Sequence, residues 1–83
     1  MEIKKGIVVR LKSFSGTLIP GKNVEPYNDY WKLIGQKGEI ISDETYNGRV
    51  LILFEKDLDQ FKVANHNPIK NSLWILPTDL DID

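Results

Sequence analysis

The side chains that could act as a nucleophile or a general base are few in this sequence. His66 is the single histidine, and the four serines are Ser13, Ser15, Ser42 and Ser72. No serine stands in the Gly-x-Ser-x-Gly pattern that places a nucleophile on a strained strand-to-helix turn. His66 lies between two turn-forming asparagines, which is more typical of a loop than of a catalytic base. We therefore expect no enzymatic activity.

Three acidic residues at alternate positions, Asp79, Asp81 and Asp83, form the pattern closest to a metal site. Their spacing is typical of the beginning of a calcium-binding loop, in which a glycine turn and a bidentate glutamate follow. Neither follows Asp83 in this sequence. The absence of cysteine excludes thiolate zinc sites and disulfides, and it is typical of a reducing compartment. We expect neither a metal site nor a cofactor.

Aromatic residues give the strongest indication of a binding function. Tyr27, Tyr30 and Trp31 lie close together in the sequence, and Trp74 lies in a later apolar segment. Aromatic side chains at the rim of a small domain offer a large contact area for docking. The polar neighbours of Tyr27 and Tyr30 indicate that both are exposed, whereas the two tryptophans are more typical of residues that cap a core. These four residues are the candidate partner-binding site.

Basic residues define an alternative surface. Residues 1–37 carry seven basic and three acidic side chains, whereas residues 38–83 carry four basic and nine acidic ones. A continuous positive stripe would favour nucleic-acid binding, but a nucleic-acid-binding domain usually has a clearer basic excess than this chain, whose net charge is −1. The candidate nucleic-acid-binding residues are Arg10, Lys12, Lys32 and Lys37.

Short β-strands must position these side chains. Alternating or continuous apolar residues predict strands over residues 3–12, 37–43, 48–55, 72–76 and 80–82. No window of helical length shows a sustained apolar repeat, so we expect only short helical turns, among them one after Asp57 and one after Leu76. The residues predicted to lie inside are Val9, Leu11, Ile40, Val50, Ile52, Phe54 and Ile75.

Two connections between the predicted strands are informative. Asn47 and Gly48 predict a tight hairpin between the second and third strands, with Gly48 at positive φ. Residues 13–34 form a long first loop that is rich in large apolar side chains. The apolar run at residues 50–54 indicates a strand buried on both faces, so we expect the loop to fold back and cover the outer one.

The segments at residues 5–10, 35–41 and 48–52 resemble the strand–loop–strand pattern of KOW-type SH3-like domains, with glycines before the second and third strands. Residues 73–80 are similar to the closing strand and turn of SH3-like barrels generally. The resemblance implies an all-β fold, a single five-stranded and partly open SH3-like barrel over residues 1–83. It also implies peptide binding by aromatics of the first loop, although this loop is much longer than in KOW domains.

With 83 residues the chain is long enough for one small domain. No apolar run approaches the ~18 residues of a membrane span, and residues 1–5 do not resemble a signal peptide, so we expect a cytoplasmic protein that binds no membrane. The predicted function is a non-enzymatic module of accessory, inhibitor or immunity type. It docks on a protein partner through residues 13–34 and the adjacent sheet edge. The alternative is a KOW-like domain associated with nucleic acid or the ribosome through its basic N-terminal strand.

Overall fold

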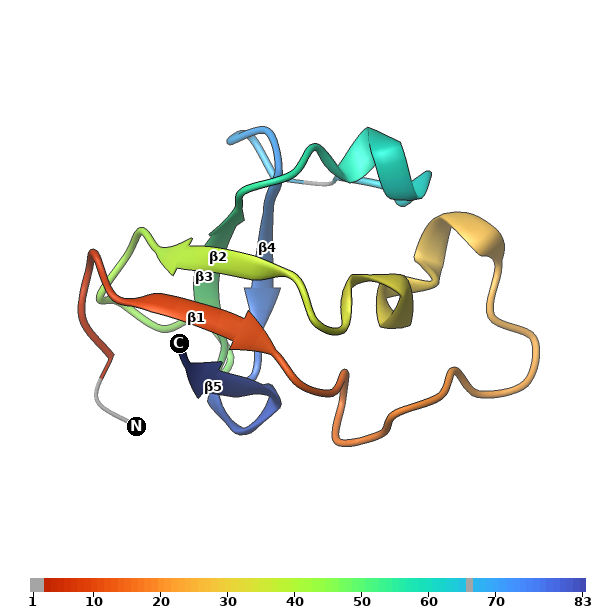
Figure 1. The fold of residues 1–83 in the computed structure, drawn as a ribbon, viewed down its shortest axis with the longest axis horizontal. Coiled ribbons are helices and arrows are strands. Elements are labelled where there is room, and N and C mark those ends of the chain that lie inside the picture. Colours follow the sequence, from red (N-terminus) through yellow and green to blue (C-terminus); the bar gives the residue numbers. More distant parts are fainter. Residues whose placement is uncertain (1–2, 66) are drawn as a thin grey trace.

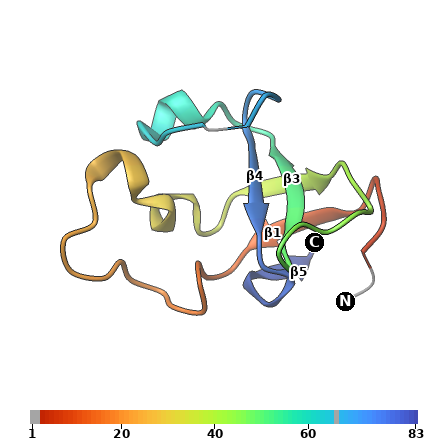
Figure 2. The ribbon, with the colours of Figure 1, turned by 180° about the vertical axis from the view of Figure 1, so that it is seen from behind.

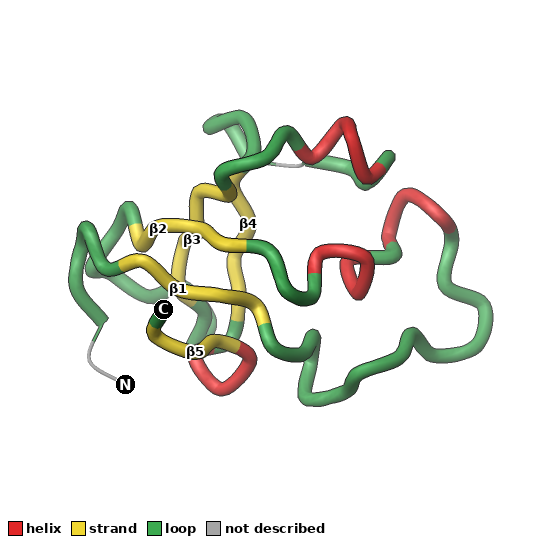
Figure 3. The backbone as a smooth tube through the Cα atoms, in the orientation of Figure 1, coloured by secondary structure: helices red, strands yellow, loops and turns green. Residues whose placement is uncertain are grey.

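The chain folds into one open β-sheet whose long connections gather at one end. The computed structural model describes residues 3–65 and 67–83. Five strands pair antiparallel in the order β4-β3-β2-β1-β5. Within the described residues the only helices are four 3-10 turns, so the protein is all-β (Figures 1 and 3). The elements in chain order are β1 (Val8–Leu11), η1 (Pro26–Asn28), η2 (Tyr30–Leu33), β2 (Lys37–Ile40), β3 (Val50–Phe54), η3 (Leu58–Phe61), β4 (Ser72–Ile75), η4 (Pro77–Asp79) and β5 (Leu80–Ile82).

The first observed strand is much shorter than the predicted one. The expected strand over residues 3–12 is reduced to β1, whose register with β2 covers residues 8–10 and with β5 residues 9–11. Gly6 has a φ of 90°, so the backbone is not extended there, although Gly6 N still donates to Ile40 O. The predicted helical turns after Asp57 and Leu76 are present as η3 and η4.

The predicted hairpin between β2 and β3 is confirmed. Asn47 and Gly48 form its tip with φ angles of 52° and 75°. The tip is closed by two backbone hydrogen bonds, Tyr46 N to Arg49 O at 3.0 Å and Arg49 N to Tyr46 O at 2.9 Å. Positive φ at both central residues matches the twist of the flanking strands. The hairpin lies at the opposite end of the sheet from residues 13–34 (Figures 1 and 2).

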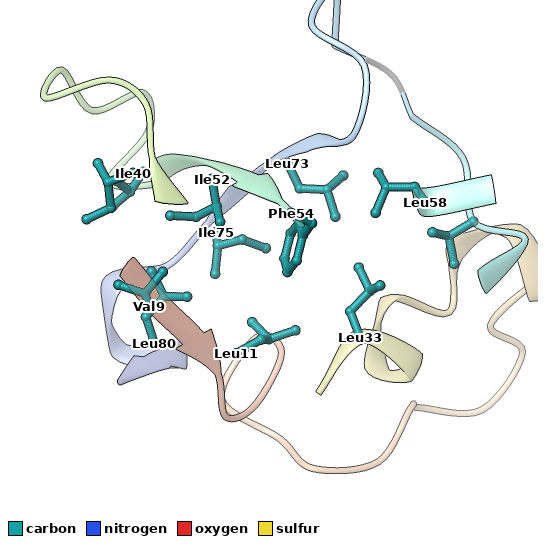
Figure 4. Packing of buried hydrophobic residues seen from close by; sticks show 12 residues of the cluster. Val9, Leu11, Leu33, Ile40, Ile52, Phe54, Leu58, Leu73, Ile75 and Leu80 are labelled. Atoms are coloured by element: carbon teal, nitrogen blue, oxygen red, sulfur yellow. The ribbon is translucent and has the colours of Figure 1, made fainter. Parts of the chain in front are cut away.

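The seven residues predicted to be internal are all buried. The core extends further than predicted, because the two long connections and further positions of β4 and β5 also contribute to it. In Figure 4 the Phe54 ring lies between the strand residues and the pair Leu33 and Leu58. Gly38 of β2 allows the sheet to pack closely on this core, since a Cβ there would lie 2.5 Å from Ile52 Cγ2. The further core residues are Leu33, Leu58, Val63, Leu73 and Leu80.

Residues 13–34 do not cover the outer face of β3, contrary to the sequence-based expectation. Leu33, the fully buried residue of this segment, packs in the same cluster as Ile52 and Phe54, on the inner side of the sheet. Leu51 points to the other face, because side chains alternate along a strand. It is buried outside that cluster and lies opposite Trp74 of β4. The apolar run of β3 is therefore unbroken because Ile52 and Phe54 lie in the core cluster, whereas Leu51 is buried on the other face of the sheet.

Replacing Ile52 with alanine should lower the free energy of unfolding by about 2–5 kcal/mol, because the side chain is fully buried at the centre of the core. The measurement is chemical denaturation of both proteins. Ile19→Ala is the control, since Ile19 is 75% exposed and its truncation should change stability by no more than about 0.5 kcal/mol. Equal stability of wild type and Ile52→Ala would contradict this description of the core.

Candidate functional site

A buried carboxylate fastens the beginning of segment 13–34 to the sheet. Asp79, the last residue of η4, is fully buried. Its carboxylate accepts hydrogen bonds from Ser13 Oγ at 2.6 Å, Ser15 N at 2.9 Å and Gly16 N at 2.9 Å. Ser15 and Gly16 both have positive φ, and successive amides in such a turn form a concave site for an anion. The first turn of the loop is therefore held against the sheet.

Three aromatic rings pack together beside this turn. The Phe14 ring centroid lies 5.4 Å from that of Tyr30 and 4.9 Å from that of Trp31. The Tyr30 hydroxyl donates to Ala64 O at 2.8 Å, and the Trp31 indole N–H donates to Thr17 Oγ1 at 2.9 Å. Burial raises the pKa of the Tyr30 phenol. The expectation that Tyr30 is exposed is therefore wrong, because its side chain is half-buried, with its ring on Phe14 and its hydroxyl bonded to Ala64 O.

The loop then presents large apolar side chains to solvent. Leu18 and Ile19 are 70% and 75% exposed, and Tyr27 is 53% exposed as predicted. The Thr17 hydroxyl lies 3.1 Å from Ile19 O and 3.2 Å from Phe14 O, so its one proton can bond to the backbone on either side of Leu18. Leu18 and Ile19 therefore depart from the expectation that the large apolar side chains of residues 13–34 pack against the sheet. An apolar pair in a loop carries no pattern that distinguishes a surface residue from a buried one.

The connection between β3 and β4 packs against the second half of the loop. Ala64 N donates to Tyr27 O at 2.8 Å, which ties this connection to η1. Lys32 Nζ lies 3.3 Å from both Pro26 O and Phe61 O, so its ammonium bridges the two connections. The turns η1, η2 and η3 accordingly lie on the same side of the sheet (Figure 3). The Lys32 side chain therefore lies between the two connections and is not part of the surface formed by Arg10, Lys12 and Lys37.

Trp74 belongs to a different surface from the other candidate aromatics. Its ring centroid lies 5.7 Å from that of Tyr46, which sits in the β2–β3 hairpin. Arg49 NH1 lies 3.4 Å from Trp74 O. The structure therefore brings Tyr30 and Trp31 together, leaves Tyr27 at the loop surface and places Trp74 with Tyr46. Sequence reasoning missed Tyr46, since nothing in the sequence links it to Trp74 in the distant strand β4.

Arg10, Lys12 and Lys37, three of the four basic residues named in the alternative prediction, gather on the outer face of β1 and β2. Arg10 lies opposite Lys37 in the register of the two strands. Both are paired with Asp83, Arg10 Nε at 3.1 Å and Lys37 Nζ at 2.9 Å. Lys12 Nζ lies 3.3 Å from Asp81 in β5. The basic face is thus matched by carboxylates of the same chain.

These ion pairs keep Asp83 ionised. The hydrogen bond from Lys37 is the main cause that lowers the pKa of the Asp83 carboxyl, and desolvation opposes it. The hydrogen bond from Arg10 and the two positive charges lower this pKa further. Because the carboxyl is charged throughout the neutral range, the positive face remains compensated there.

Comparison with known proteins adds no assignment. No family model, curated protein or solved structure matches this chain. Within residues 3–65 and 67–83 no pocket is present and no three acidic, histidine or cysteine side chains are grouped to hold a metal ion. The described part of the chain contains no helix that is long and apolar enough to span a membrane. His66 lies outside the described residues.

Replacing Asp79 with asparagine should lower the free energy of unfolding by about 1–3 kcal/mol, because an amide cannot accept three hydrogen bonds where a buried carboxylate did. Asp59→Asn is the matched control. It removes the same charge from an exposed carboxylate whose partner, Lys70, lies 3.8 Å away. Chemical denaturation of the two variants should separate them clearly, and equal losses would show that the Asp79 hydrogen bonds do not fasten the loop.

Proposed function

We propose that this protein is a non-enzymatic binding module that docks on a protein partner through segment 13–34. The observation that carries the proposal is the pair Leu18 and Ile19, two adjacent aliphatic side chains held in solvent. Singly exposed apolar residues are common on protein surfaces, but an adjacent pair on a projecting loop is a typical interaction site. Tyr27 on the same loop adds exposed aromatic area.

The loop is fixed in a way that suits docking. Asp79 fastens its first turn, and the Thr17 hydroxyl can bond to the backbone on either side of Leu18. A loop that is ordered before binding loses less conformational entropy when a partner covers it. Asp29, between η1 and η2, has a buried Oδ1 without a hydrogen-bond partner in the described part of the chain. An unsatisfied acceptor lowers stability, and such local exceptions concentrate in functional segments.

The partner that fits this surface is a protein with an apolar pocket for two aliphatic side chains. Covering one fully exposed Leu or Ile side chain contributes about 1.5–3 kcal/mol. Charge gives little selectivity here, because residues 13–34 contain two lysines and two acidic residues. In this proposal Trp31 and Tyr30 support the loop from beneath. Tyr27 borders the contact, and Trp74 is not part of it.

We also propose that the sheet is of the SH3-like barrel type. The strand order, the long first connection and the 3-10 turn between the last two strands support this assignment. The KOW-like nucleic-acid or ribosome function stays a prediction that no comparison tests. The pairing of Arg10, Lys12 and Lys37 with carboxylates of the chain argues against it. A cytoplasmic location is part of the proposal and rests on the absence of cysteine.

The double substitution Leu18→Ser and Ile19→Ser should abolish partner binding without unfolding the protein, because both side chains are exposed. Immobilised wild type first captures the partner from an extract of the native cells. The purified partner is then titrated against wild type and variant, with an expected loss of affinity on the order of 100-fold or more.

Ile69→Ser is the matched control, since Ile69 is also exposed but lies in the other connection. It should bind as tightly as wild type. Retention of the partner by the double variant would contradict the proposal. Equal loss in the Ile69→Ser control would also contradict it, because the contact would not be specific to the loop.

A further inference from the structure

The tip of the β2–β3 hairpin combines two residues with an intrinsic chemical reactivity. Asn47 is exposed, and its side-chain amide forms no hydrogen bond within the part of the chain that the structure describes. Gly48 follows it, and a Cβ built on Gly48 would meet no atom within 4 Å. The backbone nitrogen of Gly48 is therefore open to solvent and unshielded by a side chain. Its N–H takes no part in the two hydrogen bonds that close the turn, which join Tyr46 and Arg49.

The sequence Asn47–Gly48 permits a cyclisation that releases ammonia. The deprotonated Gly48 nitrogen attacks Cγ of Asn47, a new C–N bond closes a five-membered succinimide, and the amide nitrogen of the side chain leaves as ammonia. Water then adds to one of the two ring carbonyls and opens the ring. Opening at one carbonyl gives aspartate and opening at the other gives isoaspartate. Water is the only co-reactant, and no electrons are transferred.

The hairpin tip can open far enough for this ring to form. Ring closure needs the backbone at Asn47 to leave its left-handed conformation, and the one backbone pairing within the turn is the isolated Tyr46–Arg49 bridge. Residues 41–49 form no other backbone pairing across the hairpin except Ile41 N to Leu51 O. A tip with so few bonds opens locally without unfolding of the sheet.

Two other asparagines of this chain serve as controls for the reaction at Asn47. Asn23 and Asn71 also have positive φ, at 65° and 67°. Asn23 is exposed like Asn47 but precedes Val24, whose branched side chain shields the attacking nitrogen. Asn71 precedes Ser72, and its side chain is hydrogen-bonded to Leu58 N and Asp57 Oδ1. The three sites share a backbone conformation and differ in the residue that follows and in side-chain freedom.

We propose that Asn47 is a site of spontaneous, non-enzymatic deamidation in the folded protein. The product places a carboxylate two residues from Arg49, whose guanidinium is directed at Trp74 O. The isoaspartate form also inserts a backbone atom into the two-residue turn, which breaks the Tyr46–Arg49 pairing. Tyr46 then loses the position in which it packs on Trp74. The modification therefore changes both the charge and the shape of this surface.

The test is incubation of the full folded chain at physiological temperature over a series of mildly alkaline pH values, followed by peptide mapping by mass spectrometry. The expected result is loss of the Asn47 amide to a mixture of aspartate and isoaspartate, with Asn23 and Asn71 intact. The rate should rise with pH, because the attacking nitrogen must be deprotonated. A parallel sample unfolded in denaturant shows whether the Asn47 peptide reacts when no turn is present.

Two outcomes overturn the proposal. The first is conversion in denaturant with none in the folded protein, because the turn would then block the reaction. The second is equal conversion at Asn23 and Asn47, because the following glycine would then confer no reactivity. Asn47→Gly provides a second check, since it keeps a residue that tolerates positive φ and should eliminate the new species.

Discussion

The carboxylate of Asp79 is buried without a counter-ion among residues 3–65 and 67–83, and this constraint decides where the long loop lies. A buried charge is stable only if hydrogen-bond donors saturate it, and the donors come from Ser13, Ser15 and Gly16, at least 63 residues earlier in the chain. Asp79 is itself fixed between β4 and β5. The hydrogen bonds of Asp79 therefore hold the first turn of the loop at a fixed place beside the sheet, and Leu18 and Ile19 follow shortly after that turn.

The three alternating aspartates, Asp79, Asp81 and Asp83, have two different structural roles. Asp79 points inward and holds the loop, whereas Asp81 and Asp83 pair with basic residues on the outer face of β1 and β2. The aspartates whose spacing resembles a metal-binding loop therefore bind hydrogen-bond donors and basic side chains of the same chain. The same short segment orders the candidate binding loop and neutralises the competing basic surface.

Local patterns predicted the all-β class, the hairpin tip and the seven core residues, because alternation, turn residues and apolar runs act over short distances. Contacts between distant segments were not predictable in this way. Nothing near Tyr30 indicates its bond to Ala64. The turn after Asp57 was predicted, but its Asp57 side chain makes no capping hydrogen bond, and nothing near Leu58 indicates that Leu58 N donates to Asn71. The exposure of Leu18 depends on where Asp79 places the loop.

Amide hydrogen exchange at single residues tests the role of Asp79 most directly. The amides of Ser15 and Gly16 donate to the buried carboxylate, so they should exchange as slowly as a strand amide such as that of Ile40. The amides of Leu18 and Ile19, in the same loop, should exchange rapidly. If Ser15 and Gly16 exchange as rapidly as Leu18, the carboxylate does not hold the loop, and the account of an ordered docking surface is contradicted.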